Sequence, residues 1–423
     1  MKEENNGQSS LPLELRGRFA SATVYARAMD EKAIAQIITL CNQPFAQGTH
    51  IRVMPDVHTG AGCVIGLTMD LNRSHAVCPN LVGVDIGCGV RVSELGKVSL
   101  DLHQLDEKIR ETVPFGLNVH SRTVREDLDF FYALFNELVI KDQFKSREKM
   151  EWLERSLGTL GGGNHFIEID TDEDGRAYLI VHSGSRHFGL TVAKLYQERA
   201  AKSMKNSGEA DQTKIKEMVR ALTAEGKSHQ IPETLNLMKK ASAINGQNRD
   251  LAYLIGEDKD HYLHDIQLIQ TYAKRNRQRI AETLLQKMGL KEVDRFESVH
   301  NYIDDRNILR KGAIAAHVEQ RVIIPLNMRD GCILGMGKGN PEWNWSAPHG
   351  AGRLMSRHEA KKRLSLDEFQ KQMKGVFSTC VDRNTLDESP MAYKAVQDIL
   401  PALKDTVDID LILRPIYNFK ASE

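Results

Sequence analysis

Five runs of this sequence share one pattern, in which an apolar stretch leads into small residues around a histidine, aspartate or cysteine. The runs are VGVDIGCGV, GTLGGGNHFIEI, IVHSGSRHFG, SVHNYID and APHGAGR, and the reactive residues within them are Asp85, Cys88, His165, His182, His300 and His349. Glycines permit tight turns and close approach, so these side chains stay open to a reacting partner. One such run alone most often holds a solvated or hydrogen-bonded histidine, and only the recurrence of the pattern indicates a common site.

The mixture of imidazole, carboxylate and thiolate groups indicates a transition metal, because calcium and magnesium prefer sites made only of oxygen ligands. It is compatible with Mn, Zn, Co or Fe, and a thiolate such as that of Cys88 can bridge two ions. Cys88 considered alone is more typical of a small buried apolar residue. The residue types therefore indicate metal-dependent phosphoester or nucleotide chemistry without selecting one metal.

Three further features suggest phosphate or base contacts. The glycine triplet before Asn164 and His165 forms a loop able to lie along a phosphate, although such a triplet is more often a plain turn. Arg186, in HSGSR, carries a forked guanidinium that can bind a phosphate with two hydrogen bonds. His58, in MPDVHTGAG, is another candidate phosphate contact.

Short strands are expected to position these residues. Strands between glycine turns are predicted over 48–97, and helices over 101–156. Strands return at HFIEIDT and AYLIVHSG and again over 296–338, and VDIDLILRPIYNFK forms the last strand.

A helical block separates the two strand-rich regions. Residues 188–289 are predicted to be almost wholly helical, with breaks near Asn206–Gly208 and Ile231–Pro232 and an end at Gly289. We therefore predict an α+β fold: one catalytic domain over 1–423 with a β-sheet core, glycine-rich turns at the site and a helical insertion at 188–289. The alternative is that the two strand regions form separate domains.

The composition is that of a folded enzyme, with 41% hydrophobic and 27% charged residues. The 57 basic and 57 acidic residues cancel, so the net charge does not indicate nucleic acid, although a local basic groove remains compatible with it. Six scattered cysteines without a CxxC pair indicate reduced thiols in the cytosol. No signal peptide and no run of about 18 apolar residues is found, so we expect a cytoplasmic protein without membrane contact, and a monomer.

The motifs MPDVHTGAG, VGVDIGCGV, GTLGGGNHFIEI, HSGSR, HNY, RKGAI, HGAGR, MSR and DESPMAYK, in this order, resemble the signature of the RtcB family of RNA-splicing ligases. The resemblance extends from about residue 50 to Lys420. It implies an RNA ligase that uses GTP and manganese to join a 3′-phosphate or 2′,3′-cyclic phosphate end to a 5′-hydroxyl end. The RNA would be tRNA halves in splicing or damaged RNA in repair, and some relatives need an activating protein.

The resemblance also implies a role for individual residues. His349 is implied to form the covalent bond with GMP. The implied ligands of two Mn²⁺ ions, with the thiolate between them, are Asp85, Cys88, His165, His182 and His300. The positions implied to contact the guanylate are Asn164, Phe166, Glu168, Asn301, Pro325, Leu326, Asn327, Met328, Cys332, Gly350, Ala351, Gly352 and Lys420.

The sequence departs from the family pattern around the expected guanine pocket. The usual IPGSM run is IPLNM here, so Leu326 and Asn327 replace Gly and Ser, and Cys332 falls at a later serine position. Every implied metal ligand and His349 are retained, which favours a divergent but active ligase. The alternatives are a metal-dependent phosphoesterase that processes RNA ends without ligation, and a non-catalytic RNA-binding subunit.

Overall fold

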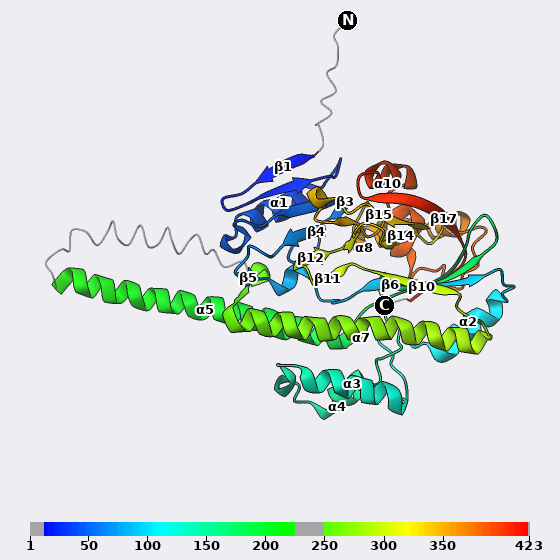
Figure 1. Cartoon of the computed structure of the whole chain (residues 1–423), viewed down its shortest axis with the longest axis horizontal. Coiled ribbons are helices and arrows are strands. Elements are labelled where there is room, and N and C mark those ends of the chain that lie inside the picture. Colours follow the sequence, from blue (N-terminus) through cyan, green and yellow to red (C-terminus); the bar gives the residue numbers. More distant parts are fainter. Residues whose placement is uncertain (1–11, 225–248, 422–423) are drawn as a thin grey trace, which may run out of the picture.

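The computed structural model describes residues 12–224 and 249–421, and its core consists of two large β-sheets (Figure 1). The first has six strands in the order β1-β2-β3-β4-β12-β11. Its strands are β1 (Leu13–Arg16), β2 (Ser21–Val24), β3 (Ile51–His58), β4 (Ile65–Asp70), β11 (Asn301–Ile303) and β12 (Ile308–Lys311).

The second sheet has seven strands in the order β10-β6-β8-β7-β17-β15-β14. Its strands are β6 (Gly89–Gly96), β7 (Phe166–Thr171), β8 (Ala177–Ser183), β10 (Asp294–Val299), β14 (Arg321–Asn327), β15 (Gly331–Gly337) and β17 (Val407–Lys420). Two short pairs complete the strands of the described residues: β5 (Ala76–Val77) with β9 (Leu254–Ile255), and β13 (Ala313–Ala315) with β16 (Ser346–Pro348).

Both large sheets combine strands from the two strand-rich regions of the sequence. In the first sheet β4 pairs with β12, and in the second β7 pairs with β17. Such pairing places the two regions in one hydrogen-bonded framework, so the alternative of two separate strand domains is wrong. The predicted α+β class with a β-sheet core is confirmed.

The seven-stranded sheet curls into a near-barrel. Its two edge strands, β10 and β14, contact each other, and the Ile323 amide donates a hydrogen bond to the Ser298 hydroxyl at 3.0 Å. Side chains on the concave face form an apolar interior that includes Val92, Ile180 and Leu413. Since residues alternate between the two faces of each strand, the opposite face is free to pack against helices.

The described residues also form the α-helices that lie around the two sheets. They are α1 (Glu31–Cys41), α2 (Leu102–Thr112), α3 (Arg125–Glu137), α4 (Arg147–Glu154), α5 (Arg186–Ala224), α7 (Gly256–Met288), α8 (Arg357–Arg363), α9 (Leu366–Gln372) and α10 (Val396–Leu403). The long helix α7 runs beneath the sheets with α3 and α4 on its other side (Figure 1). Its Ile280 and Leu284 share a core cluster with Ile167 and Val181 of the seven-stranded sheet. No helix in the described ranges combines the length and hydropathy of a membrane span.

Two predictions about the helical block have different outcomes. The predicted end of the helical block at Gly289 is confirmed, because Gly289 caps α7 with a left-handed φ of 65°. The predicted break at Asn206–Gly208 is wrong, since α5 passes through it without interruption. Asn and Gly cost only about 1 kcal/mol or less each in a helix, which the long flanking helical sequence tolerates. The predicted break at Ile231–Pro232 lies outside the described residues, and the insertion boundaries 188–289 stay a prediction.

Candidate active site

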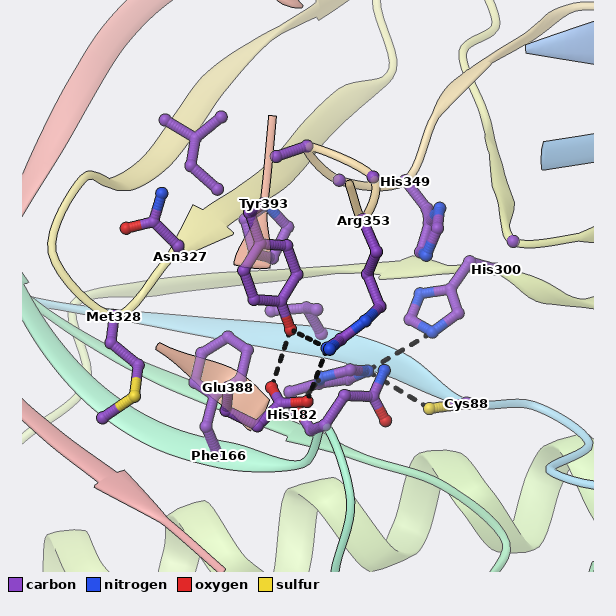
Figure 2. Close-up of a pocket in the computed structure, with 18 of the residues that line it drawn as sticks. Cys88, Phe166, His182, His300, Asn327, Met328, His349, Arg353, Glu388 and Tyr393 are labelled. Carbon is purple, nitrogen blue, oxygen red and sulfur yellow. Dashed lines mark hydrogen bonds and ion pairs between the residues drawn. The ribbon is translucent and has the colours of Figure 1, made fainter. Parts of the chain in front are cut away.

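The candidate residues converge on one cavity of about 300 Å³ (Figure 2). All of them line this cavity except three: His165, which lies beneath its surface, and Cys332 and Arg186, which lie behind other lining residues. The cavity also has lining residues that the sequence analysis did not single out, among them Arg353, Arg357, Glu388, Tyr393 and Asn418.

The order of the strands explains why the predicted metal ligands meet. His182 lies opposite Val90 of β6 on one side and opposite Phe166 of β7 on the other. Cys88 directly precedes β6, His165 directly precedes β7, and His300 directly follows β10, the other neighbour of β6. Adjacent strands in register therefore bring positions far apart in the sequence to one edge of the sheet.

Backbone hydrogen bonds hold two of these turns together. The Gly87 amide donates to the Asn301 carbonyl at 2.6 Å, and the His300 amide donates to the Cys88 carbonyl at 2.9 Å. Gly87 has a φ of 70°, and a Cβ at this position would lie 2.9 Å from the Cβ of Ala273 on α7. Glycine is therefore required here both for the left-handed turn and for the close approach to the helix.

The ligand atoms of the predicted metal site face one another. The Cys88 Sγ lies 3.4 Å from His165 Nε2 and 3.2 Å from His182 Nε2. The Nε2 atoms of His182 and His300 are 3.3 Å apart, and His165 Nε2 is 2.9 Å from Asp85 Oδ2. The ligand atoms of Cys88, His165 and His182 thus lie within 4.8 Å of one another, with the Asp85 carboxylate beside His165 and the His300 imidazole beside His182.

The hydrogen bonds of the Nδ1 atoms indicate the tautomers of His165 and His182. His165 Nδ1 lies 2.9 Å from the Leu160 carbonyl, and His182 Nδ1 lies 3.0 Å from the Asn164 carbonyl. A carbonyl only accepts hydrogen bonds, so each Nδ1 carries the proton and each Nε2 presents a lone pair. His165 Nε2 and Asp85 Oδ2, which lie 2.9 Å apart, are both atoms that can ligate a cation. The donor set fits a transition-metal ion.

Burial keeps the central imidazoles neutral. It lowers the pKa of His182 well below its usual range, and the neighbouring His165 lowers it further. Burial likewise lowers the pKa of His300, with an additional effect from His349. Neutral imidazole is the form that binds a metal ion.

His349 is held by an aspartate from a distant strand. Its Nδ1 lies 2.7 Å from Asp56 Oδ2, and its backbone amide donates to the same oxygen at 3.1 Å. Asp56 is fully buried, whereas the His349 ring faces the cavity beside the His300 ring, with ring centroids 4.9 Å apart (Figure 2). The Nδ1 proton is therefore donated to Asp56, and Nε2 is available to react. The sequence analysis missed Asp56, although it lies in the MPDVHTGAG motif.

The pocket residues near the divergent IPLNM run are held by local contacts. The Asn327 side-chain amide donates to Asp330 Oδ2 at 2.7 Å, and its oxygen accepts from the backbone amides of Arg329 and Asp330 at 3.0 Å. Leu326 packs in an apolar core cluster with Ile399 of α10. Asn327 thus stabilises the β14–β15 turn, and Leu326 contributes to the packing beneath the cavity wall.

Glu388 forms a buried ionic cluster that the sequence analysis also missed. Its Oε2 accepts from Lys420 Nζ at 2.8 Å and from the Tyr393 hydroxyl at 2.7 Å. Its Oε1 accepts from Arg353 at 3.1 Å and lies 2.7 Å from Arg357 (Figure 2 shows the Arg353 and Tyr393 contacts). The DESPMAYK motif contains both Glu388 and Tyr393, so their shared motif was the available signal.

The Glu388 cluster predicts an acid-sensitive contribution to stability. Burial alone would raise the pKa of Glu388, but Lys420, Arg357 and Arg353 lower it by more, to about 2. A carboxyl whose pKa is lower in the folded state stabilises the protein above its unfolded pKa and loses this effect as pH falls towards the folded pKa. We therefore expect Glu388→Gln to lower the free energy of unfolding at neutral pH by about 3 kcal/mol.

Urea unfolding of wild type and Glu388→Gln from neutral pH downwards measures this effect. The difference between the two proteins should shrink as the pH falls from the usual glutamate pKa towards about 2. Exposed Glu148 on α4, replaced by Gln, is the control and should change little. A difference that stays constant over this pH range would contradict the prediction.

The two predicted RNA-phosphate contacts lie at different depths. His58 lines the cavity, with Nδ1 3.0 Å from the Asp56 carbonyl. Arg186 lies behind the metal ligands, where its Nε donates to the Thr159 hydroxyl at 3.2 Å. A Cβ at Gly161 would lie 2.0 Å from Arg186 Nη1, so this glycine makes room for the guanidinium. Direct binding of RNA phosphate by His58 or Arg186 stays a prediction.

Comparison with known proteins identifies the family of this chain. The family model for tRNA-splicing ligase RtcB matches residues 36–421. The RNA-splicing ligase RtcB of Escherichia coli (strain K12) is 30% identical over 422 residues, which covers 92% of this chain and 94% of that protein. The tRNA-splicing ligase RtcB of Aeropyrum pernix is 26% identical over 421 residues, which covers 82% of each protein. The chain therefore belongs to the RtcB family of tRNA-splicing ligases.

Proposed function

We propose that this chain is a GTP- and Mn²⁺-dependent RNA ligase that joins a 3′-phosphate or 2′,3′-cyclic phosphate end to a 5′-hydroxyl end. The observation that carries the proposal is the Asp56–His349 pair, which leaves one imidazole nitrogen free in the cavity beside His300. A neutral imidazole in this setting is a competent nucleophile and a good leaving group. Transfer through such a group divides one difficult reaction into easier steps.

In the first step, Nε2 of His349 attacks the α-phosphorus of GTP. A nitrogen–phosphorus bond forms, the bond from the α-phosphorus to the bridging oxygen breaks, and pyrophosphate leaves. The imidazole becomes positively charged because Nδ1 keeps its proton, and the carboxylate of Asp56 at 2.7 Å stabilises this charge.

The residues implied to bind metal would hold Mn²⁺ at the base of the cavity; they are Asp85, Cys88, His165, His182 and His300. When bound, Mn²⁺ supplies positive charge beside the reacting phosphates. Arg353 and Lys420 line the same cavity, and their cationic groups can hold phosphate oxygens.

The guanylate then moves to the RNA. A 3′-phosphate oxygen attacks the guanylate phosphorus, the bond to His349 breaks, and the RNA end carries an activated phosphate. The 5′-hydroxyl oxygen of the second RNA attacks the 3′-phosphorus, GMP leaves, and the hydroxyl proton passes to solvent. A 2′,3′-cyclic phosphate must first add water to become a 3′-phosphate.

The RNA substrate that we propose is a pair of broken ends, either tRNA halves or damaged RNA. The names of the relatives point to tRNA and RNA splicing. We further propose that the protein acts in the cytoplasm as a monomer and that an activating protein assists turnover.

A direct test incubates the purified protein with Mn²⁺, α-³²P-GTP and two RNA fragments, one ending in a 3′-phosphate and the other starting with a 5′-hydroxyl. We expect a covalent label on the protein and a joined RNA, both absent when EDTA replaces Mn²⁺. Fragments that end in a 3′-hydroxyl serve as the control and should not be joined. Processing of the RNA ends without any label would support the phosphoesterase alternative instead. RNA binding that EDTA does not change, with no chemistry, would support a binding subunit.

A further inference from the structure

Two carboxyl groups lie side by side in the apolar interior of the seven-stranded sheet. Glu168 and Asp170 project from the same face of β7 and stand directly across from Ile180 and Tyr178 of β8. Their exposed fractions are 2% and 0%. Two ionised carboxylates here would repel each other and lose their hydration, so either one carboxyl is protonated or a cation joins them.

The available hydrogen-bond donors differ between the two groups. Glu168 accepts a hydrogen bond from the Asn418 side-chain amide, and its Oε1 lies 3.7 Å from the Cys332 thiol. Lys420, whose charge also acts on Glu168, lines the same cavity. The Cys332 thiol also lies near Asp170, within 4.8 Å, but neither oxygen of Asp170 forms a hydrogen bond with any described residue. The negative charge therefore belongs on Glu168, and a shared proton belongs on Asp170.

The other groups facing this pair are consistent with that distribution. Burial raises the pKa of Asp170 well above its usual range, and the charge of Glu168 raises it further. Burial also raises the pKa of Glu168, but Asp170, Asn418 and Lys420 all act to lower it. Burial also raises the pKa of the Cys332 thiol, so the thiol is neutral and can donate to Glu168. On β8, the Tyr178 hydroxyl donates to Asp172 at 3.1 Å and is directed away from the pair.

We infer that Asp170 keeps a proton at neutral pH and donates it to Glu168, which makes Glu168 a fixed, charged acceptor for a nucleobase with adjacent N–H donors. Guanine is such a base, because it carries a ring N–H next to its amino group. Glu168 lines the cavity and Asp170 does not, so Asp170 is a positioning residue that acts through Glu168. This inference rests on the proposed use of GTP.

Two substitutions of Asp170 test the role of its proton separately from the role of its side-chain shape. Asp170→Asn keeps a neutral hydrogen-bond donor of the same shape, and we expect the KM for GTP in protein guanylation to stay close to that of wild type. Asp170→Val removes the donor but suits the apolar surroundings, so the protein should fold. Without the donor, Glu168 itself takes up a proton more readily and loses its role as acceptor.

The pH profile distinguishes this role from a structural one. For Asp170→Val we expect the KM for GTP to be about tenfold or more above wild type at neutral pH, with kcat unchanged, and to recover as the pH rises. Wild type and Asp170→Asn should not show this recovery. A KM for Asp170→Val that equals that of wild type at every pH would overturn the inference.

Infrared spectroscopy tests the proton without any enzymatic reaction. The difference spectrum of wild type minus Asp170→Asn at neutral pH should contain the carbonyl stretch of a protonated carboxylic acid, and its absence would overturn the inference. A metal ion bound between Glu168, Asp170 and Cys332, whose ligand atoms lie within 4.8 Å of one another, would also overturn the inference. Such an ion would stay bound in Cys88→Ala and would be lost in Asp170→Asn. If wild type took up no GMP, the proposed function would fail, whereas the infrared band would still decide where the proton lies.

Discussion

Replacing His349 with alanine is expected to abolish the covalent labelling of the protein by α-³²P-GTP and to reduce RNA joining by more than about a thousandfold. The reason is that the imidazole is the only group that we propose to carry the guanylate. A methyl group in its place leaves the cavity and the metal ligands intact but provides no nucleophile. Labelled protein on a denaturing gel, together with joined RNA, measures both effects.

An exposed histidine provides the control, and a substitution of Asp56, the partner of His349, is expected to have an intermediate effect. His103→Ala changes an exposed histidine on α2 and should leave labelling unchanged. Asp56→Asn keeps the shape but removes the negative charge beside Nδ1, so labelling should slow on the order of a hundredfold or more without disappearing. Full labelling of His349→Ala would show that another residue carries the guanylate and would refute the proposed mechanism.

Replacing Cys88 with alanine is expected to deplete the protein of bound metal and to reduce guanylation by at least about a hundredfold. The Cys88 Sγ contacts the Nε2 atoms of both His165 and His182, at 3.4 Å and 3.2 Å, so its loss opens the centre of the ligand set. Elemental analysis of protein dialysed against Mn²⁺ measures the metal, and labelling with α-³²P-GTP measures the activity.

A matched thiol provides the control for this prediction. Cys380 is also buried and free, but it lies in the core cluster under the seven-stranded sheet, outside the cavity. Cys380→Ala should therefore keep its metal and its activity. Unchanged metal content and guanylation in Cys88→Ala would exclude this thiol as a ligand, and the metal would then have to bind elsewhere.

Much of the fold was predictable because strand and helix signals are local. The alternating apolar residues of HFIEIDT and VDIDLILRPIYNFK predict strands. In the structure β7 contains all of the first run except His165, and β17 contains the whole of the second. Gly289 predicts a helix end, since few other residues adopt the left-handed conformation of a C-cap. The prediction failed at Asn206–Gly208, where weak local preferences compete with a long helix that continues on both sides.

By itself, the sequence determined which chemical groups are available at the site. Asp85, Cys88 and His182 lie in glycine-rich or small-residue runs whose motif order indicates the family. Side-chain chemistry and turn conformation are properties of neighbouring residues, so they are visible without a structure.

Only the tertiary structure decided which partners these groups have. Asp56 and His349 are 293 positions apart, and Glu388 meets Lys420 and Arg353 only after the strands and turns are packed together. The same packing places Asp170 next to Glu168 in an apolar interior, where neither oxygen of Asp170 has a hydrogen-bond partner among the described residues. Hydrogen bonds and pKa values depend on distance and burial in three dimensions. Strand register and packing across the whole chain fix these quantities, and no local pattern contains them.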